Sequence, residues 1–345
     1  MRKLLNTLYI TNELAYCALD GENIVILVEN KEVKRVPFVN FENIVCFNYL
    51  GCSPALMGKC GENGIPICFL RPSGRFLARV TGEIKGNVHL RRAQFEKLAN
   101  ENGQACLKLA QNVIAAKFHN SRHVLARSIR DHSDKIDVDA INGTIRSISA
   151  SIEAVYETRD IDSVRGYEGE CSRKYFGVFD ELIIKNKDDF KFVNRTKYPP
   201  LDKVNAMLSY FYTILSLDIQ AALESVGLDP YIGFFHADRS GRASLALDLI
   251  EELRAYLVDR FVLSMINLQQ VKGDDFLQKE GGGIIMTDEC RKTMLTSWQK
   301  RKHETITHPV IKEKIEIGLI PYVQANLLAK YIRDDIPEYT PYICE

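Results

Sequence analysis

The periodicity of the apolar residues changes near Gly82, and this change limits the possible folds more than any other feature of the sequence. Before Gly82, short segments rich in β-branched and aromatic residues alternate with Gly, Asn or Asp, which is typical of strands. After Gly82, apolar residues recur with a helical period over long stretches. We therefore predict an α+β fold: a small N-terminal β-sandwich domain, residues 1–83, followed by a larger all-helical C-terminal domain, residues 84–345.

The strand and helix predictions rest on separate segments. The predicted strands are LLNTLYI, AYCALDG, NIVILVEN, KEVKRVPF, NIVCFNYL, GIPICFL and GRFLARV. The predicted long helical stretches begin at Arg91, Ile141, Asn205, Ser244 and Val323. A short helix is also expected after Ser53, because a serine followed by proline suits a helix N-terminus.

The composition is that of a chain that can bury a large core. Of its 345 residues, 46% are hydrophobic, and no run approaches the about 18 consecutive apolar residues of a membrane span. The nine cysteines are scattered and contain no Cys-x-x-Cys pair, so we expect reduced thiols and a cytoplasmic protein. Asn6 interrupts the first apolar stretch, which makes it a poor signal peptide.

The charges are unevenly distributed along the chain, although 45 basic and 45 acidic residues give a formal net charge of zero. Residues 85–130 hold nine basic and two acidic side chains, a balance of +7. Residues 131–170 hold ten acidic and four basic side chains, a balance of −6. This pattern indicates either a phosphate-binding surface beside an acidic metal site or two solvated helix faces.

The stretch GFFHADRSGRASLALDLIEELR, residues 233–254, places a histidine ahead of a leucine-rich run with three carboxylates. If SLALDLIEELR is helical with Ser244 as N-cap, then Asp248, Glu251 and Glu252 share one face. Together with His236, these carboxylates suit Mg²⁺ or Mn²⁺. The alternative is an amphipathic helix with a solvated acidic face, preceded by a core histidine.

Two upstream stretches also hold polar residues next to apolar helices. In RGYEGECSRKYFGVFDELI, Glu168 and Glu170 are expected to enter a helix, where the helix dipole favours acidic residues. In NRTKYPPLDKVNAMLSYFYTIL, basic Arg195 and Lys197 precede two prolines, and Asp202 is the expected N-cap. Spacing alone does not bring these stretches together in space.

Five motifs that occur in one order resemble the CRISPR-associated protein one family, the integrase of CRISPR adaptation. They are SPALMGKCGENGIPICFLRPSGRFLARV, EGECSRKYF, KYPPLDKVNAMLSYFYTIL, GFFHADRSGRASLALDLIEELR and PYVQANLLAKYI. The resemblance runs over nearly the whole chain, and the segments LLNTLYI and GNVHLRRAQ are similar to those of type I-C systems. It implies the β-sandwich and the helical domain predicted above.

The resemblance also implies a catalytic site that holds one Mg²⁺ or Mn²⁺. By position, the metal ligands fall on Glu168 of a Glu-Gly motif, on His236 of a Gly-Phe-x-His motif, and on Glu251. Asp248, one turn before Glu251, matches a second acidic position near the metal and has a supporting role. Some relatives have Asp in place of Glu251, which changes the reach of the side chain and not its charge.

The implied reaction is phosphoryl transfer, in which the 3′-OH of a short double-stranded DNA fragment attacks a phosphodiester at the end of a CRISPR repeat. The candidate contacts to the DNA backbone are Arg122, Arg127, Arg130, Arg195 and Lys197. The implied partners are a second copy of the chain, CRISPR-associated protein two and, in type I-C systems, the CRISPR-associated protein four nuclease.

Two other functions remain open from the sequence. The first is a stand-alone metal-dependent nuclease acting on branched or single-stranded DNA, with water as the attacking group. The second is a non-catalytic DNA scaffold, which is disfavoured because all three ligand positions are filled.

Overall fold

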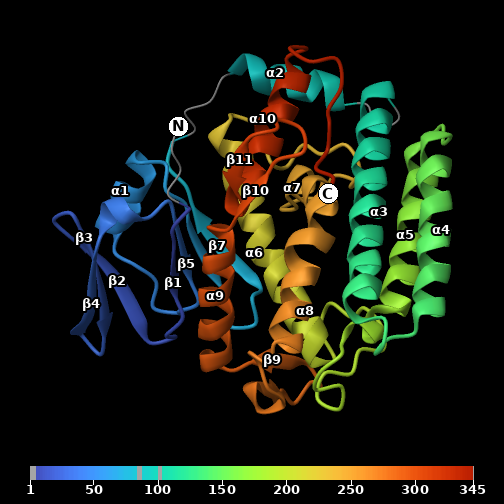
Figure 1. Ribbon diagram of the computed structural model, residues 1–345. Helices are drawn as coiled ribbons and strands as arrows, with labels where there is room; N and C mark the ends of the chain where they lie inside the picture. Colours follow the sequence, from blue (N-terminus) through green and yellow to red (C-terminus); the bar gives the residue numbers. More distant parts are fainter. Residues whose placement is uncertain (1–4, 84–87, 100–102, 345) are drawn as a thin grey trace.

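Strands gather at one end of the molecule and helices make up most of the remainder (Figure 1). The computed structural model describes residues 5–83, 88–99 and 103–344. The predicted α+β class is confirmed, since the strands are concentrated in the N-terminal part. The predicted domain boundary after residue 83 adjoins residues 84–87, which lie outside the described part of the chain, and it stays a prediction.

All seven segments predicted as strands contain one, and they form two sheets. The first sheet has the order β1-β5-β6-β7, in which β1, β5 and β6 are parallel and β7 is antiparallel to β6. The second sheet is antiparallel, with the order β2-β3-β4. The strands are β1 (Thr7–Ile10), β2 (Ala15–Asp20), β3 (Asn23–Val28), β4 (Lys31–Pro37), β5 (Asn43–Cys46), β6 (Ile67–Leu70) and β7 (Phe76–Val80).

The first sheet separates two hydrophobic cores and contacts both. In β6, Ile67 contacts the core shared with the second sheet, whereas Cys68 and Leu70 contact the core of the helical part. In β5, Ile44 and Val45 face opposite cores in the same way. Because successive side chains of a strand point to opposite faces, a sheet that is apolar on both faces attaches the sandwich to the helices.

The helical part contains nine helices and two short hairpins among the residues described from Val88 onward. The helices of the molecule are α1 (Pro54–Glu62), α2 (Val88–Leu98), α3 (Gln104–His132), α4 (Val138–Tyr156), α5 (Ile161–Gly177), α6 (Lys203–Ser225), α7 (Ser244–Leu253), α8 (Arg260–Asn267), α9 (Asp288–Lys302) and α10 (Ile320–Ile332). The hairpins are β8 (Phe276–Gln278) with β9 (Ile284–Met286), and β10 (Thr305–Thr307) with β11 (Lys314–Glu316). Short 3-10 helices cover Phe38–Asn40, Phe179–Leu182, Gly273–Asp275 and Ile317–Leu319.

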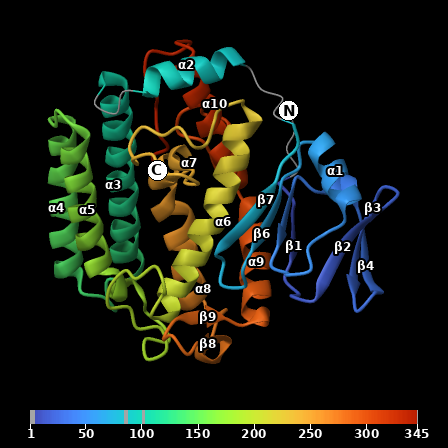
Figure 2. The same ribbon diagram turned by 180° about the vertical axis from the view of Figure 1, so that it is seen from behind.

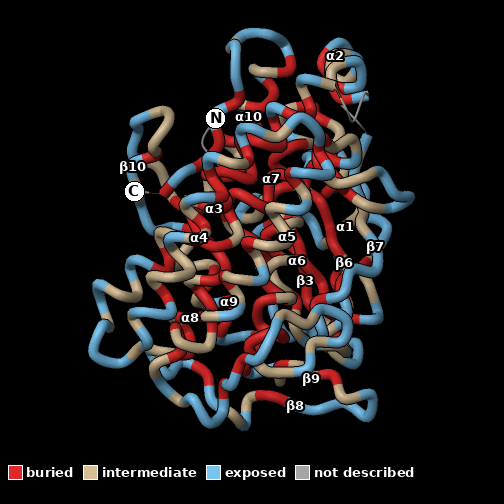
Figure 3. The backbone as a smooth tube through the Cα atoms, turned by 90° about the vertical axis from the view of Figure 1, so that its right-hand side faces the viewer, coloured by how far each residue is buried: buried red, intermediate tan, exposed pale blue. Residues whose placement is uncertain are grey.

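Three central helices position the candidate site. Helix α7 packs between α3 and α6, and α5 packs on the far side of α3 together with α4. Viewed from behind, α6 lies between the β6–β7 edge of the sandwich and the group α3, α4 and α5 (Figure 2). Buried residues concentrate along this centre, as the tube in Figure 3 shows. Helix α6 is long and apolar enough to cross a membrane by composition, but 72% of its apolar window is buried inside the molecule.

Most of the predicted helix ends are observed, with two differences around α7. Ser53 caps α1 by accepting a hydrogen bond from Leu56 N at 3.2 Å, and Asp202 caps α6 in the same way. The prediction that Ser244 caps α7 is wrong, because Ser244 is the first helical residue and its Oγ lies 3.4 Å from Ala237 O. The long stretch from Ser244 is also not one regular helix, since a π-helix at Arg254–Asp259 separates α7 from α8.

Candidate functional site

The residues predicted as metal ligands come from three separate elements. Glu168 lies in the middle of α5, His236 lies in the loop between α6 and α7, and Glu251 lies in α7. The expectation that Glu168 and Glu170 enter the first turn of their helix is wrong, because α5 begins at Ile161. Glu168 therefore gains nothing from the helix N-terminus, and its charge must be matched by side chains of other elements.

Asp248 shapes the turn that carries His236. Its carboxylate accepts hydrogen bonds from the backbone N–H groups of Phe234, Phe235 and His236 at 2.6, 3.1 and 2.9 Å. The Nδ1 atom of His236 lies 2.7 Å from Asp248 Oδ1 and donates to it, since an ionised carboxylate can only accept. Gly233 is required here, because a Cβ at this position would lie 2.6 Å from Asp248 Oδ2.

The orientation of His236 is that of a metal ligand. With Nδ1 directed at the fully buried Asp248, Nε2 is the ring nitrogen left for another partner. Metal-binding histidines usually donate their other ring N–H to a carboxylate in this manner, which fixes the tautomer and the ring plane. Asp248 therefore supports the site through His236.

A lysine that the sequence analysis did not single out joins the other two predicted ligands. The ammonium group of Lys117, on α3, donates to Glu251 Oε2 at 2.7 Å and makes a short hydrogen bond to Glu168 Oε1. Ser172 also donates to Glu168 Oε1, at 2.8 Å, and Arg254 lies 2.6 Å from Glu251 Oε1. The structure thus brings Glu168 and Glu251 to opposite sides of one cation.

The charges of this cluster keep its carboxylates ionised despite their burial. Burial raises the pKa of Glu251, but Arg254, Lys117 and His236 lower it more strongly, to about 2. The structure thus forms two pairs of predicted site residues, Glu168 with Glu251 through Lys117, and His236 with Asp248. Burial likewise raises the pKa of Glu168, and Lys117 more than reverses the effect.

The side chains of Glu168, Glu251 and His236 are of the types that bind a hard divalent cation. In this structure the Lys117 ammonium pairs with the two glutamates instead. Two ionised carboxylates and an imidazole nitrogen are ligands that Mg²⁺ and especially Mn²⁺ accept. Within the described part of the chain, no three His, Cys, Asp or Glu side chains are arranged to hold a metal. The ammonium of Lys117 pairs with both Glu168 and Glu251, the two predicted ligands that share one partner.

The expectation that Asp248, Glu251 and Glu252 share one face is wrong for Glu252. Its carboxylate points toward the C-terminal segment and accepts hydrogen bonds from Tyr339 Oη at 2.7 Å and Gln324 Nε2 at 3.0 Å. The alternative of a solvated acidic face is also wrong, because all three carboxylates are buried. Helix α7 is enclosed on every side, so each of its acids requires its own partners.

A buried network continues the site along the π-helix. Arg254 stacks on the ring of Tyr212 at 4.8 Å from its centroid, and Tyr212 Oη donates to Asp259 at 2.5 Å. Tyr175 Oη donates to the other Asp259 oxygen at 3.0 Å. The sequence analysis did not single out Lys117, Arg254 or the residues of this network. One sequence signal could have found Lys117: it interrupts an apolar helix stretch, where a charge is costly without a partner.

The predicted DNA-binding residues on α3 are placed along its C-terminal half. Arg122 is half-buried against α4, where it donates to Ser149 Oγ at 3.2 Å. Arg127 and Arg130 are exposed and both lie 3.2 Å from Asp131. The cationic excess of this segment is thus partly matched by acidic partners, and Lys97 and Lys108 pair with Asp334 and Glu338 as well. Lys85 lies outside the described residues.

The two basic residues before α6 have different surroundings. Arg195 is held internally, with its guanidinium 2.6 Å from Asn205 Oδ1 and 2.9 Å from Ser209 Oγ. Lys197 lies close to the carboxylate site: burial, Arg254 and Arg195 lower its pKa, and Glu251 acts in the opposite direction. Of the two, Lys197 is the one placed beside an open cavity.

This cavity, of about 480 Å³, is cationic. Its walls come from the β6–β7 turn, the loop before α6 and the β8–β9 hairpin, and we call it the cationic cavity. Its charged lining residues, among those the structure describes, are Arg71, Arg75, Lys197 and Lys279, and no carboxylate accompanies them. The sequence analysis missed three of these four, because they are far apart in the chain.

Comparisons with known proteins show a family by sequence and a shared fold by structure. The sequence model of the family described as CRISPR associated protein Cas1 matches residues 8–300. The CRISPR-associated endonuclease Cas1 1 of Chlorobaculum tepidum is 44% identical over 343 residues, 99% of each chain. A casposase bound to integration product has a TM-score of 0.85 at 20% identity, over 99% of this chain and 94% of the casposase. One chain of a Cas6-RT-Cas1–Cas2 complex has a TM-score of 0.82 at 22% identity. The match covers 98% of this chain and 36% of that chain. On the family match and the curated relative, this chain belongs to the Cas1 family.

Proposed function

We propose that this chain is a metal-dependent DNA endonuclease and integrase of CRISPR adaptation, which joins 3′-OH ends of short DNA fragments to the CRISPR repeat. The observation that carries the proposal is the pair of ionised carboxylates, Glu168 and Glu251, held around one cation beside a histidine oriented by Asp248. The curated relative is named an endonuclease, and the casposase of the same fold is bound to an integration product. The proposal unites these two activities.

Each residue of the site has a distinct part in the proposed reaction. Glu168, His236 and Glu251 would hold Mg²⁺ or Mn²⁺, and Asp248 holds the His236 ring in the required tautomer. The metal, when bound, neutralises charge on the phosphodiester and stabilises the attacking and leaving oxygens. Arg254 keeps the Glu251 carboxylate ionised and fixed in direction.

The cationic cavity is the proposed route of the DNA backbone to this site. Phosphates are attracted to clustered lysine and arginine side chains that lack acidic neighbours. Lys197 lines the cavity, and Glu251 acts on the pKa of Lys197, which supports placing the cavity on the approach to the carboxylates. Arg122, Arg127 and Arg130, and Arg195, remain the sequence-based candidates for further contacts.

The proposed assembly and location follow from the family. We propose a homodimer that works with Cas2, because the fold matches 36% of one chain of a solved Cas6-RT-Cas1–Cas2 complex, and with Cas4 as a further partner. The location is proposed as cytoplasmic, since all nine cysteines are free and buried.

The decisive experiment replaces the one neutral ligand. His236→Ala is expected to lower strand transfer into a repeat-bearing plasmid about 10²–10³-fold, because the phosphodiester charge loses its stabilisation. Melting temperature and DNA affinity should change far less than strand transfer, since Asp248 keeps its three backbone donors when the His236 ring is removed. His303→Ala, on the far α9 surface, is the matched control and should transfer strands normally.

The products distinguish the competing functions. Wild-type protein that hydrolyses branched or single-stranded DNA and never joins strands, with or without Cas2, would indicate the stand-alone nuclease. Loss of stability, DNA binding and strand transfer together in His236→Ala would indicate a core histidine. Strand transfer at the wild-type rate in this variant would exclude His236 from the site.

A further inference from the structure

Lys117 is a charged residue in the most buried part of α3. Its neighbours on the helix, Ile114 and Phe118, are fully buried, and its own side chain is 9% exposed. A lysine in such surroundings is tolerated only when its charge is matched. Its partners, Glu168 and Glu251, are the two carboxylates assigned above to a metal ion.

The cluster is already neutral without a metal ion. Glu168 and Glu251 contribute two negative charges, and Lys117 and Arg254 contribute two positive charges. Both oxygens of Glu251 are engaged, one by each cation. A divalent ion added to this arrangement would leave two uncompensated positive charges in a buried place, which is strongly unfavourable.

Of the two cations, Lys117 is the one that can move. The Arg254 guanidinium is fixed by stacking on Tyr212 and by its contact with Glu251. A lysine ammonium ends a flexible four-carbon chain and makes no planar, two-point contact. Its departure would free Glu251 Oε2 and would leave Glu168 Oε1 with the hydrogen bond from Ser172.

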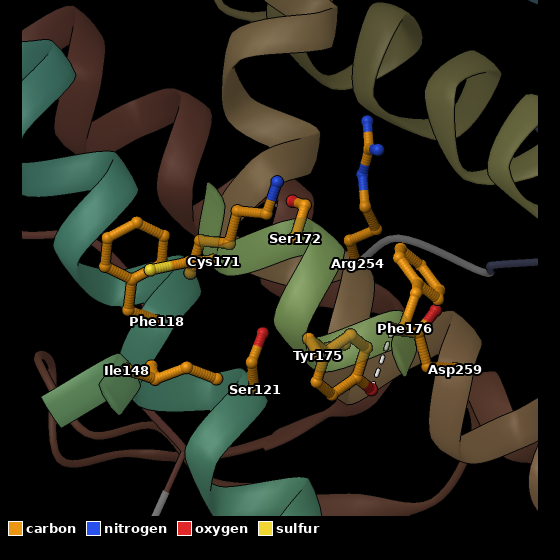
Figure 4. Close-up of a pocket in the computed structure, with 11 residues that line it drawn as sticks. Phe118, Ser121, Ile148, Cys171, Ser172, Tyr175, Phe176, Arg254 and Asp259 are labelled. Carbon is orange, nitrogen blue, oxygen red and sulfur yellow. Dashed lines mark hydrogen bonds between the residues drawn. The ribbon is translucent and has the colours of Figure 1, made fainter. Parts of the chain in front are cut away.

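A small cavity beside Lys117 offers space for the displaced group. Its volume is about 20 Å³, enough for about one water-sized group. Ser172, Cys171, Tyr175 and Asp259 surround it, and the Tyr175–Asp259 hydrogen bond closes one side (Figure 4). The lining is mostly apolar, and Ser121 and Ser172 are the residues of it whose hydroxyl oxygens could accept from an ammonium that leaves the two glutamates.

We propose that Lys117 is a built-in counter-cation of the site: it holds Glu168 and Glu251 together in the metal-free protein, and a divalent ion must displace its ammonium to bind. Lys117 is thus a positioning residue that sets the affinity of the site for metal. This inference rests on the metal site of the proposed function, and the following experiment separates the two.

The test measures metal binding and stability of the full-length protein, with no DNA present. Lys117→Met keeps the length of the side chain and removes its charge. In chelator, this variant should melt at a lower temperature than wild type, because Glu168 and Glu251 then repel each other. The dissociation constant for Mn²⁺, measured by electron paramagnetic resonance, should be at least about tenfold lower, and Mn²⁺ should raise the melting temperature more than in wild type.

Three further variants complete the design. Lys117→Gln retains N–H donors for both carboxylates and replaces the methionine variant if that variant does not fold. Lys117→Arg keeps the charge and should bind Mn²⁺ no more tightly than wild type. Lys108→Met, which removes an exposed lysine of the same helix, should change neither quantity.

The outcomes separate this inference from the proposed function. Mn²⁺ affinity in Lys117→Met or Lys117→Gln that equals or falls below that of wild type overturns the role of Lys117. If instead wild type, Lys117→Met and Lys117→Gln all bind no Mn²⁺, the metal site itself is wrong and the counter-cation role fails with it.

Discussion

At the scale of single residues, neighbours in the sequence can have opposite electrostatic surroundings. Glu251 faces two cations, and after the cost of burial its pKa is about 2. Glu252 is equally buried but faces only neutral donors, and burial raises its pKa to about 8. The composition of α7 is therefore a poor guide to the charge it carries, since each carboxylate is defined by its own partners.

Asp259 allows a pH test of this point away from the predicted ligands. Burial raises its pKa from 3.8 to about 6, although Tyr212, Tyr175, Arg254 and Arg195 oppose the rise. Because the folded state binds a proton that the unfolded state releases, the free energy of unfolding should fall as pH rises from about 4 to about 6, by at most about 1.4 kcal/mol per unit. Urea unfolding of Asp259→Asn should lack this part of the slope. Parallel pH profiles for both proteins would contradict the assignment.

At the scale of elements, short connections bring the cationic side chains together. The β6–β7 turn supplies Arg71 and Arg75, and the β8–β9 hairpin supplies Lys279. The turn packs tightly, since Gly74 has φ +83° and a Cβ there would lie 2.7 Å from the Tyr210 ring. Gly283 approaches Pro199 almost as closely, so the β6–β7 turn is fixed against α6 and the β8–β9 turn against the loop that carries Lys197.

Alanine replacement of Arg71, Arg75 and Lys279 should weaken binding to unrelated DNA sequences about equally. The slope of log affinity against log salt should decrease by about one for each lost phosphate contact. The matched variant replaces Arg122, Arg127 and Arg130, which tests the sequence-based prediction with the same change in charge. We expect a smaller loss there, because Asp131 already neutralises part of that charge. An unchanged salt slope in the first variant would exclude the cationic cavity as a DNA surface.

At the scale of the whole molecule, the sandwich and the helices are joined by one sheet and by a two-point ion pair. Arg79 of β7 donates to both carboxylate oxygens of Glu224 on α6, at 2.8 and 2.6 Å. The Arg79 side chain is 9% exposed, so its charge depends on this partner. The apolar contacts of β5 and β6 do not by themselves fix the orientation of the sandwich on the helices, because hydrophobic contacts are non-directional. The two-point ion pair adds a directional contact.

Arg79→Met should lower the free energy of unfolding by about 1–3 kcal/mol, because Glu224 keeps its charge and loses its partner. The double variant Arg79→Met with Glu224→Met should recover much of this loss, since no unpaired charge remains. Urea unfolding of wild type, both single variants and the double variant completes the cycle. Additive losses in the double variant would show that the pair makes no net contribution.

The sequence by itself determined the features that depend on local patterns. Apolar periodicity gave the N-terminal strands and most of the long helices, and side-chain chemistry gave the caps at Ser53 and Asp202. The family resemblance gave Glu168, His236, Asp248 and Glu251 as site residues, and their roles stay a prediction. The structure pairs Glu168 and Glu251 through Lys117, and His236 with Asp248. The strand, helix and cap predictions succeeded because a helix or strand period is written in adjacent residues.

The tertiary structure alone decided what each buried charge faces. Lys117 meets Glu168 across 51 positions of the chain and Glu251 across 134, and no spacing rule reaches so far. The same holds for the parallel pairing of β1, β5 and β6, for the cationic cavity, and for the turn of Glu252 toward Tyr339. The physical reason is that a buried charge is costly unless it is paired. The partner can come from any segment that packing brings close, and packing depends on the whole chain.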